Sequence, residues 1–335
     1  MKKRVTMKDI ADAVGVSTVA VSKALAGKDG ISDRLRAKIK ETAEEMGYTH
    51  SQTVKRPANG LSGNIGIIVA ECFIKDDSFY FKYFNHLSKY LQMNGFYAFF
   101  HTLSYSNEEN LVLPKIYYEN RVDGFIILGQ VSKKYSETVL ATGRPVVFLD
   151  FYDDNINVDC VIFNSFYSSY ELTSYLVTNG HREIAFIGNI HATSSIQDRY
   201  LGYYKSLIEH RLPLRDEYLI SDRTDNGMMI PLVLPDKMPT AFVCNCDEVA
   251  CRLIIQLKEQ GYRVPQDISV VGFDNSVYST ISEPNITTFE VNTDEMSKLA
   301  VDVILKKIDN SDTSYGRMHV DGSIVYKSSV ANAKT

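Results

Sequence analysis

The sequence lacks any long hydrophobic run and any recognisable export segment. No stretch of about 18 apolar residues occurs, so no transmembrane helix is expected. The chain starts MKKRVTMKDI, which lacks the apolar core that a secretory signal peptide needs. We therefore expect a cytoplasmic protein.

The sequence contains few cysteines, and their number is odd. The 335 residues include five cysteines, in mostly apolar and strand-like surroundings. This pattern predicts reduced thiols rather than a disulfide framework. Two of them form a C-x-C pair, but no Cys or His lies at ligand spacing, so no metal site is expected. The cysteines are Cys72, Cys160, Cys244, Cys246 and Cys251.

Motifs of the common enzyme classes are also missing. The sequence has no G-x-G-x-x-G, no G-x-x-x-x-G-K-[ST], no H-E-x-x-H and no G-x-S-x-G. Its seven histidines are scattered. We therefore expect no catalytic residues, no cofactor and no enzymatic activity.

Charge is distributed unevenly. The whole chain has a formal net charge of −5, but residues 1–58 hold twelve basic and seven acidic residues. The remainder holds 24 basic and 34 acidic residues. A basic head on an acidic body favours contact with nucleic acid through the head alone.

The head reads as three short helices. Thr6 and Asp9 have the spacing of a capping box, and Gly15 can end the first helix in the left-handed conformation. Ser17 is a good N-cap for a second helix, and Ser32 for a third. The tight turn between the first two helices is typical of a helix-turn-helix that reads DNA.

The second helix has two distinct faces. At about 100° per residue, one arc is short, polar or basic, as a major-groove reader needs. The opposite arc is small and apolar, so it allows close helix packing. The alternative is a small three-helix bundle without a partner. The outer arc comprises Thr18, Val19, Ser22 and Lys23, and the inner arc Ala20, Val21, Ala24 and Leu25.

From residue 64 onward, short apolar runs alternate with helical stretches. Such runs with helical crossovers predict parallel sheets covered on both faces, and their number predicts two sheets. In such sheets, ligands bind at the carboxyl ends of the strands. The expected strands are 64–70, 96–103, 123–129, 145–150, 160–164, 183–189, 240–245 and 268–275, and the expected helices include 79–94, 165–179, 197–210 and 247–260.

Head and body together resemble the lactose/galactose repressor (LacI/GalR) family of bacterial transcription regulators. The agreement in order and spacing runs almost from end to end. The segments that carry it are VTMKDIADAVGVSTVAVSKAL (5–25), MGY (46–48), NIGIIV (64–69), RVDGFIILG (121–129), PVVFLD (145–150), NGHREIAFIG (179–188), DRYLGYYKSL (198–207), TAFVCNCDEVA (240–250) and RVPQDISVVGFDN (263–275).

The resemblance implies an α/β protein with an N-terminal three-helix helix-turn-helix domain. Its body is implied to be periplasmic-binding-protein-like (type I), with two doubly wound parallel-sheet subdomains. The implied domains are residues 1–48 for DNA binding, 49–61 for the hinge and 62–331 for effector binding and dimerisation. The N-subdomain would comprise 62–161 and 291–320, and the C-subdomain 162–290 and 321–331.

The resemblance also assigns the residues that contact DNA. Thr18, Val19 and Lys23 match the base-reading positions, whereas Thr6, Ser17 and Ser22 match phosphate-contacting positions. We expect Val19, which is apolar where relatives often carry a polar side chain, to pack on a thymine methyl group.

A small effector is implied to bind between the two subdomains. Arg199 matches the family arginine that donates paired hydrogen bonds, and Asp274 follows a strand at the cleft. The alternative for these two residues is a salt bridge between the subdomains. Further effector-binding candidates are Asp150, Ser195, Phe79 and Tyr80.

Two regions depart from the family pattern. Lys55 takes a DNA-contacting position in the hinge, but Pro57 falls where relatives carry a leucine that wedges into the minor groove. We therefore expect weaker DNA bending, or a wedge placed elsewhere. Phe163 and Cys246 stand where some relatives have polar ligand contacts, and Asp247 is expected to cap the following helix.

The function implied by the resemblance is a homodimeric, ligand-controlled regulator, most often a repressor, that binds double-stranded operator DNA. The aromatic side chains around the cleft favour a carbohydrate effector, with a nucleobase or another metabolite as the alternative. The alternative is a non-regulatory cytosolic carbohydrate-binding protein or a carbohydrate enzyme, which would need a pair of carboxylates across a sugar site. The DNA-reading head and the lack of an export segment argue against the binding protein, and the sequence marks no such pair of carboxylates for the enzyme.

Overall fold

The computed structural model describes residues 5–25, 28–46, 48, 60–74, 78–310 and 313–334. The chain divides into two compact units, Met1–Asn59 and Gly60–Thr335. The first unit is helical and the second is built around two sheets.

Local sequence signals set the ends of the three helices in the first unit. The helices are α1 (Met7–Val14), α2 (Thr18–Leu25) and α3 (Asp33–Glu45). Thr6 and Asp9 form the predicted capping box at α1. Gly15 ends that helix with a φ of 76°, a left-handed conformation that glycine adopts without steric penalty. Ser17 and Ser32 accept the predicted N-cap hydrogen bonds of α2 and α3.

The three helices enclose one small apolar core. Two small residues in it, Ala11 and Ala24, allow α1 and α2 to approach closely, as the inner arc of the second helix predicted. The fully buried members are Ile10, Ala11, Val21, Ala24, Ile39 and Ala43.

The first sheet of the second unit has the strand order β11-β5-β4-β3-β1-β2, and all its pairs are parallel. Alternate residues of its strands face two separate cores, because side chains of a strand point to opposite faces. Its strands are β1 (Asn64–Ala70), β2 (Tyr97–Leu103), β3 (Gly124–Leu128), β4 (Val146–Leu149), β5 (Cys160–Phe163) and β11 (Arg317–Val320).

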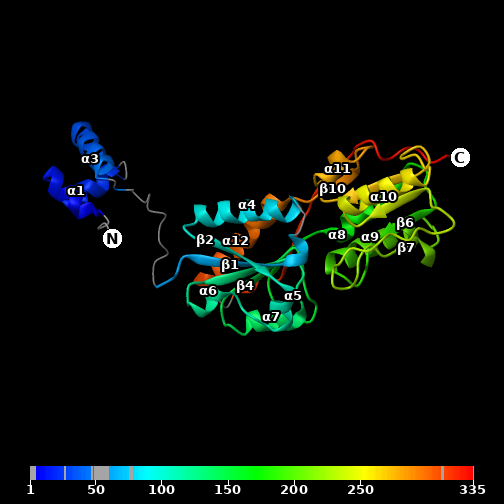
Figure 1. The fold of residues 1–335 in the computed structure, drawn as a ribbon, viewed down its shortest axis with the longest axis horizontal. Helices are drawn as coiled ribbons and strands as arrows, with labels where there is room; N and C mark the ends of the chain where they lie inside the picture. Colours follow the sequence, from blue (N-terminus) through cyan, green and yellow to red (C-terminus); the bar gives the residue numbers. More distant parts are fainter. Residues whose placement is uncertain are drawn as a thin grey trace. The chain divides into compact units, whose positions relative to one another are not determined.

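Helices cover both faces of this sheet (Figure 1). One face packs against α4 (Ser78–Met93) and α12 (Thr293–Asp309), and the other against α6 (Lys115–Tyr118) and α7 (Lys133–Leu140). The short α5 (Tyr105–Glu109) follows β2. We call this sheet and its helices the first lobe.

The second sheet has the order β12-β10-β9-β8-β6-β7, in which only the β10–β12 pair is antiparallel among the described residues. We call it and its helices the second lobe. Its strands are β6 (Ile184–Ile187), β7 (Leu219–Ile220), β8 (Ala241–Cys244), β9 (Ser269–Phe273), β10 (Thr287–Glu290) and β12 (Ser323–Val325), and its helices are α8 (Ser165–Thr178), α9 (Ser194–Glu209), α10 (Asp247–Glu259) and α11 (Tyr278–Ile281).

The predicted α/β class with two largely parallel sheets is therefore confirmed. All eight expected strands are present, with ends shifted by up to two residues. The chain passes between the lobes three times, after β5, β10 and β11. Within the described ranges, no helix is both long enough and apolar enough to cross a membrane.

Candidate functional site

The outer face of α2 is the first candidate site. Its four outward side chains are all exposed, and Val19 has 64% of its surface accessible although it is apolar. Val21 and Ala24 on the opposite face are buried. The structure therefore brings Thr18, Val19, Ser22 and Lys23 together on one accessible helix surface of the first unit.

Two further predicted DNA contacts lie at the helix ends. The hydroxyl of Thr6 bonds to a carboxylate oxygen of Asp9 at 2.6 Å, and the hydroxyl of Ser17 accepts from the N–H of Ala20 at 3.2 Å. Both side chains are exposed, and each hydroxyl keeps capacity for another partner. Lys55 and Pro57 lie outside the described residues, so the predictions on the hinge stay predictions.

The second candidate site is a cavity of about 330 Å³ in the second unit. Its lining comes from segments that follow the carboxyl ends of strands in both sheets. Cys72, Gln130 and Asp150 follow β1, β3 and β4, whereas Cys246 and Asp274 follow β8 and β9. This is the position at which open α/β sheets bind ligands.

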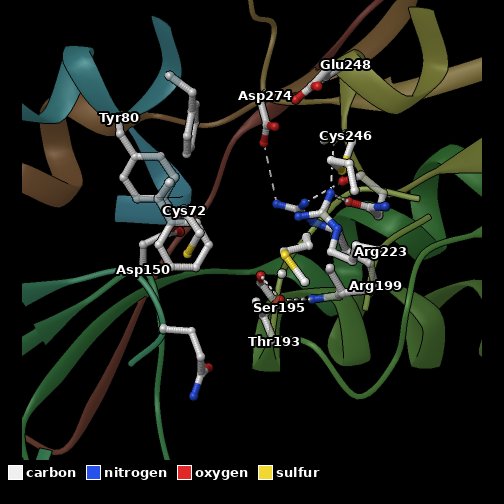
Figure 2. A pocket seen from close by; sticks show the side chains of 18 of the residues that line it. Cys72, Tyr80, Asp150, Thr193, Ser195, Arg199, Arg223, Cys246, Glu248 and Asp274 are labelled. Atoms are coloured by element: carbon white, nitrogen blue, oxygen red, sulfur yellow. Dashed lines mark hydrogen bonds and ion pairs between the residues drawn. The ribbon is translucent and has the colours of Figure 1, made fainter. Parts of the chain in front are cut away.

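All six predicted effector residues line this one cavity. Figure 2 shows the labelled side chains of the first lobe, among them Tyr80 and Asp150, facing those of the second lobe. The six are Phe79, Tyr80, Asp150, Ser195, Arg199 and Asp274.

Arg199 and Asp274 form an ion pair inside the cavity. Nη2 of Arg199 lies 3.5 Å from Oδ1 of Asp274, and Nη1 donates to the carbonyl oxygen of Asn245 at 2.5 Å. The guanidinium also lies 4.6 Å from the centre of the Phe273 ring. Both partners belong to the second lobe, so the alternative of a salt bridge between subdomains is wrong, although the contact itself exists.

The buried Nε of Arg199 has no hydrogen-bond partner among the described residues. A buried donor without a partner is unfavourable unless a ligand or water supplies one. Arg199 is therefore held in place by Asp274 and Asn245 with bonding capacity still to be satisfied.

Asp150 faces the pair from the first lobe. Its Oδ2 accepts a hydrogen bond of 3.2 Å from the hydroxyl of Tyr80. Burial raises the pKa of the Asp150 carboxyl from 3.8 to about 7. The positive charge of Arg199 and the bond from Tyr80 lower this pKa, whereas the negative charge of Asp274 raises it further.

The backbone at both acidic residues is in the left-handed region. The φ angle is 67° at Asp150 and 97° at Asp274. Such conformations are uncommon for residues other than glycine, and they concentrate at functional sites. Here they turn the chain immediately after β4 and β9, which leaves both carboxylates at the edge of the cavity.

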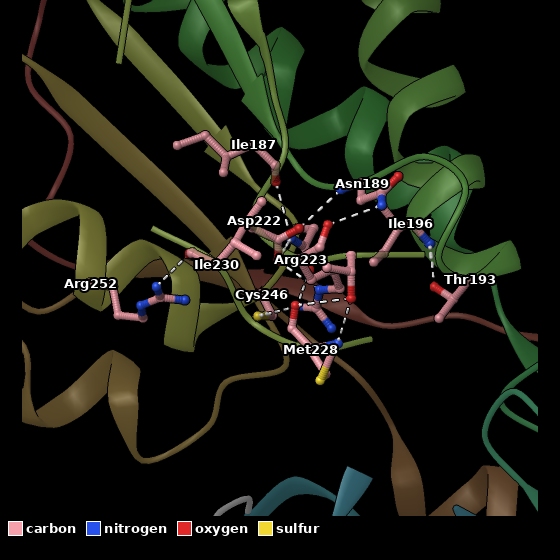
Figure 3. Close-up of polar contacts among 12 residues, drawn as sticks. Ile187, Asn189, Thr193, Ile196, Asp222, Arg223, Met228, Ile230, Cys246 and Arg252 are labelled. Carbon is pink, nitrogen blue, oxygen red and sulfur yellow. Dashed lines mark hydrogen bonds and ion pairs between the residues drawn. The ribbon is translucent and has the colours of Figure 1, made fainter. Parts of the chain in front are cut away.

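Arg223 is a charged residue of the cavity that the sequence analysis missed. It follows β7 and forms a close ion pair with Asp222, at 2.7 Å between Nε and Oδ2 (Figure 3). Its Nη2 donates to Oδ1 of Asn245 at 3.2 Å and lies 3.8 Å from the sulfur of Cys246. The sequence held only a weak signal, because β7 has two residues and forms no marked apolar run.

The irregular segment after Arg223 completes the cavity wall. Gly227, Met228 and Met229 all line the cavity. This gives a role to a stretch for which the sequence suggested none. The remaining lining residues that were not foreseen are Cys72, Phe73, Tyr105, Gln130, Thr193, Ile196, Asn245 and Glu248.

Two expectations for the cleft are corrected. Cys246 lines the cavity, but Phe163 packs in the core against Phe289, with ring centres 5.7 Å apart. Asp247 is not the N-cap of α10; Cys246 holds that position. The buried carboxylate of Asp247 instead accepts hydrogen bonds from the backbone N–H and hydroxyl of Ser276.

The chemistry of the cavity is that of binding. Its lining combines guanidinium and carboxylate groups with aromatic rings and sulfur atoms. The described residues include no group of three or more His, Cys, Asp or Glu side chains placed to hold a metal ion. All five cysteines are free thiols.

Two family models match the chain in the order of the two units. Residues 6–51 match "Bacterial regulatory proteins, lacI family", and residues 173–330 match "Periplasmic binding protein-like domain". The first match covers the three helices and the exposed face of α2. The head therefore belongs to the lacI family of bacterial regulatory proteins.

Relatives of the family match over nearly the whole chain. The ribose operon repressor of Haemophilus influenzae is 27% identical over 333 residues, which cover 98% of this chain and 99% of that protein.

Solved structures of the family share the fold. A lac repressor dimer bound to operator and the anti-inducer ONPF has a TM-score of 0.74 at 21% identity, covering 98% of this chain and 100% of that one. A complex of the transcriptional regulator CelR with cellobiose has a TM-score of 0.70 at 20% identity, covering 97% and 100%.

Proposed function

We propose that the protein represses transcription and that a small effector bound in the cavity controls its affinity for operator DNA. The observation that carries the proposal is the cavity at the strand ends, in a chain that also holds a DNA-reading head. The related ribose operon repressor, which matches from end to end, supports repression over activation.

In this proposal, α2 reads bases in the major groove. Thr18, Val19 and Lys23 contact base edges, while the hydroxyls of Thr6, Ser17 and Ser22 contact phosphates. Lys55 adds a contact from the hinge. The exposure of the described members supports these roles, since a base-reading side chain must be free of the core of its own domain.

A carbohydrate suits the cavity best as effector. Arg199 donates hydrogen bonds and Asp274 accepts them, so the pair complements a hydroxyl group that does both. Phe79 and Tyr80 supply aromatic surface for the apolar face of a sugar ring. The CelR regulator, whose fold this chain shares, was solved with cellobiose bound.

The effector acts by changing how the two lobes close. A ligand shifts such an equilibrium only by its difference in affinity for the two states. We assign 62–161 with 291–320 to one lobe and 162–290 with 321–331 to the other, with 49–61 as the linker to the head. A homodimer would place two heads on a near-palindromic operator. This role requires a location in the cytoplasm, together with the DNA.

We propose no catalytic activity for the cavity. Carbohydrate binding alone does not require the exposed face of α2, so this face argues against a non-regulatory carbohydrate-binding protein. The relatives lend no support to a carbohydrate enzyme, because the ribose operon repressor of Haemophilus influenzae matches this chain over 99% of its own length. Turnover of any sugar by the purified chain would contradict this part of the proposal.

The test is a genomic DNA-binding selection with the purified full chain, with and without a panel of sugars at one stated salt concentration. We expect a palindromic site whose occupancy one sugar changes. A fall in occupancy indicates an inducible repressor, and a rise indicates a corepressed one. The absence of any enriched site under all conditions would overturn the proposal.

A further inference from the structure

The cavity has an excess of negative charge. Its lining includes three carboxylates and two guanidiniums. Each guanidinium already has an acidic partner, because Arg199 pairs with Asp274 and Arg223 pairs with Asp222. Asp150 is left as a cavity carboxylate that makes no ion pair with any described residue.

The described side chain that hydrogen-bonds to Asp150 compensates its negative charge poorly. The carboxylate accepts one hydrogen bond from a neutral donor, the hydroxyl of Tyr80. Isolated buried carboxylates are strongly disfavoured, so such groups either take up a proton or acquire a positive partner. Burial raises the pKa of Asp150, and the nearby positive charge of Arg199 offsets this rise only in part.

Aromatic rings stand beside Asp150. The ring of Tyr80 stacks on Phe73, with centres 5.2 Å apart, and meets Phe79 edge to face at 5.4 Å. Phe73, Phe79, Tyr80 and Tyr105 all line the cavity. An aromatic wall next to a carboxylate is the arrangement that recognises ammonium groups, since the ring faces carry negative potential.

The opposite wall has a different character. Arg199, Asn245 and Asp274 of the second lobe present donors and acceptors in fixed positions (Figure 2). This wall suits hydroxyl groups. A ligand that satisfies both walls therefore has hydroxyls on one side and a cation on the other.

We infer that the effector is an amino sugar whose ammonium group lies against Asp150 and the aromatic wall, with its hydroxyls on Arg199 and Asp274. This inference rests on the proposed function and narrows its ligand class. A neutral sugar can donate a hydroxyl hydrogen to Asp150, but it leaves the carboxylate without charge compensation.

The test is isothermal titration calorimetry of the full chain with three families of probes. Each family comprises a neutral hexose, its amino sugar and its N-acetylated amino sugar: glucose, galactose or mannose with the corresponding glucosamine, galactosamine or mannosamine derivatives. We expect one amino sugar to bind at least about tenfold more tightly than both neutral members of its family, as a charge-assisted hydrogen bond would provide.

The variant Asp150→Asn separates charge from shape, because the amide keeps the size and can still accept from Tyr80. We expect it to lose the preference for the amino sugar, so that the amino sugar and the neutral hexose bind this variant with affinities within about threefold of each other. A residue with a merely structural role would weaken both ligands alike. Glu171→Gln removes one charge from an exposed position of α8 and should retain the preference.

Three results would overturn the inference. They are equal or tighter binding of a neutral member, no binding of any amino sugar, and a preference that survives Asp150→Asn. The proposed function is judged separately. If a neutral sugar binds and changes operator occupancy, the proposed regulatory function is supported and only the inferred ammonium group is contradicted. Failure of the DNA selection would contradict the regulatory function itself.

Discussion

The hydroxyl of Tyr80 donates a hydrogen bond of 3.2 Å to Oδ2 of Asp150, which lies 70 residues later in the chain. Tyr80 is near the start of α4 and Asp150 is directly after β4, so the bond joins the first turn of a helix to a loop at the same edge of the first sheet. It holds a cavity carboxylate that forms no ion pair with the described side chains. The pH dependence of stability should reveal this arrangement.

We predict that Asp150→Asn flattens the dependence of the free energy of unfolding on pH. The pKa of Asp150 is about 7 in the folded protein against an ordinary value of 3.8. Between these values the folded state holds a proton that the unfolded chain has released, so stability falls as pH rises through this window. The variant lacks this loss and should be more stable by roughly 1–3 kcal/mol above about pH 8, and nearly unchanged near pH 4.

Urea unfolding at a series of pH values measures this effect. Glu171→Gln, at an exposed position of α8, is the matched control and should follow the wild-type curve. Equal pH dependence of wild type and Asp150→Asn would show that the carboxyl of Asp150 titrates as it does in the unfolded chain.

We predict that Val19→Gln changes the operator sequence that the protein selects. Val19 is 64% exposed at the outer face of α2, where an apolar side chain can contact a thymine methyl group. A glutamine amide instead favours adenine, with a discrimination of about 1–3 kcal/mol for a well-placed bidentate pair. A binding-site selection with both proteins should show the change at one position of each half-site.

The control for this selection is Ala37→Gln, which adds the same amide to an exposed position of α3. It should leave the consensus as it is. If Val19→Gln also selected the wild-type consensus, the packing of Val19 on a thymine methyl would be refuted.

The sequence predicted the parts of this fold that have strong local signals. The capping box at Thr6 and the glycine at position 15 fixed the ends of α1, and the long apolar runs marked eight strands. The sequence analysis proposed no strand for β7, β10, β11 or β12. These have two to four residues, and most lie at or near sheet edges, so no apolar run distinguishes them.

Among the cavity residues, too, only those with a clear signal in the sequence were predicted. The six foreseen residues came from family resemblance or from a position after a marked strand, as for Asp150 and Asp274. Arg223 was not predicted because β7 is too short to be recognised in the sequence. Met228 was not predicted because it lies in an irregular segment. Pairing partners such as Asp222 for Arg223 depend on tertiary packing, which the spacing of residues along the chain does not specify.

We predict that Gly202→Ala destabilises the second lobe. Gly202 lies where α9 crosses α8, and an added Cβ would be 2.0 Å from the carbonyl oxygen of Phe166. Alanine improves helix propensity by about 1 kcal/mol, but the two helices must separate to admit the methyl group. Overpacking of this kind costs about 1–3 kcal/mol or more, so we expect a net loss of stability.

Thermal unfolding measures this change. Gln197→Ala introduces alanine at an exposed position of the same helix by truncating a side chain, and should have an effect within about 0.5 kcal/mol. Unchanged stability of Gly202→Ala would mean that α8 and α9 can move apart without loss of packing.

We predict that Tyr152→Phe weakens effector binding without touching the effector. The hydroxyl of Tyr152, in the loop after β4 of the first lobe, donates to Oδ1 of Asp198 on α9 of the second lobe at 2.9 Å. The guanidinium of Arg317 lies 3.6 Å from the centre of the Tyr152 ring and orients it. The bond ties the two lobes together at the side of the cavity, and it opposes the rise that burial causes in the pKa of Asp198.

Loss of the hydroxyl removes about 0.5–1.5 kcal/mol from the closed arrangement, so effector affinity should fall by about 2–10-fold. Calorimetry with the effector found in the selection measures the affinity, and solution scattering reports the closure of the lobes. Tyr167→Phe deletes a hydroxyl from an exposed tyrosine on α8 and should bind as the wild type does. Equal affinity of Tyr152→Phe and wild type would mean that the bond between Tyr152 and Asp198 persists equally in the open and closed states, and that closure is set by contacts with the ligand alone.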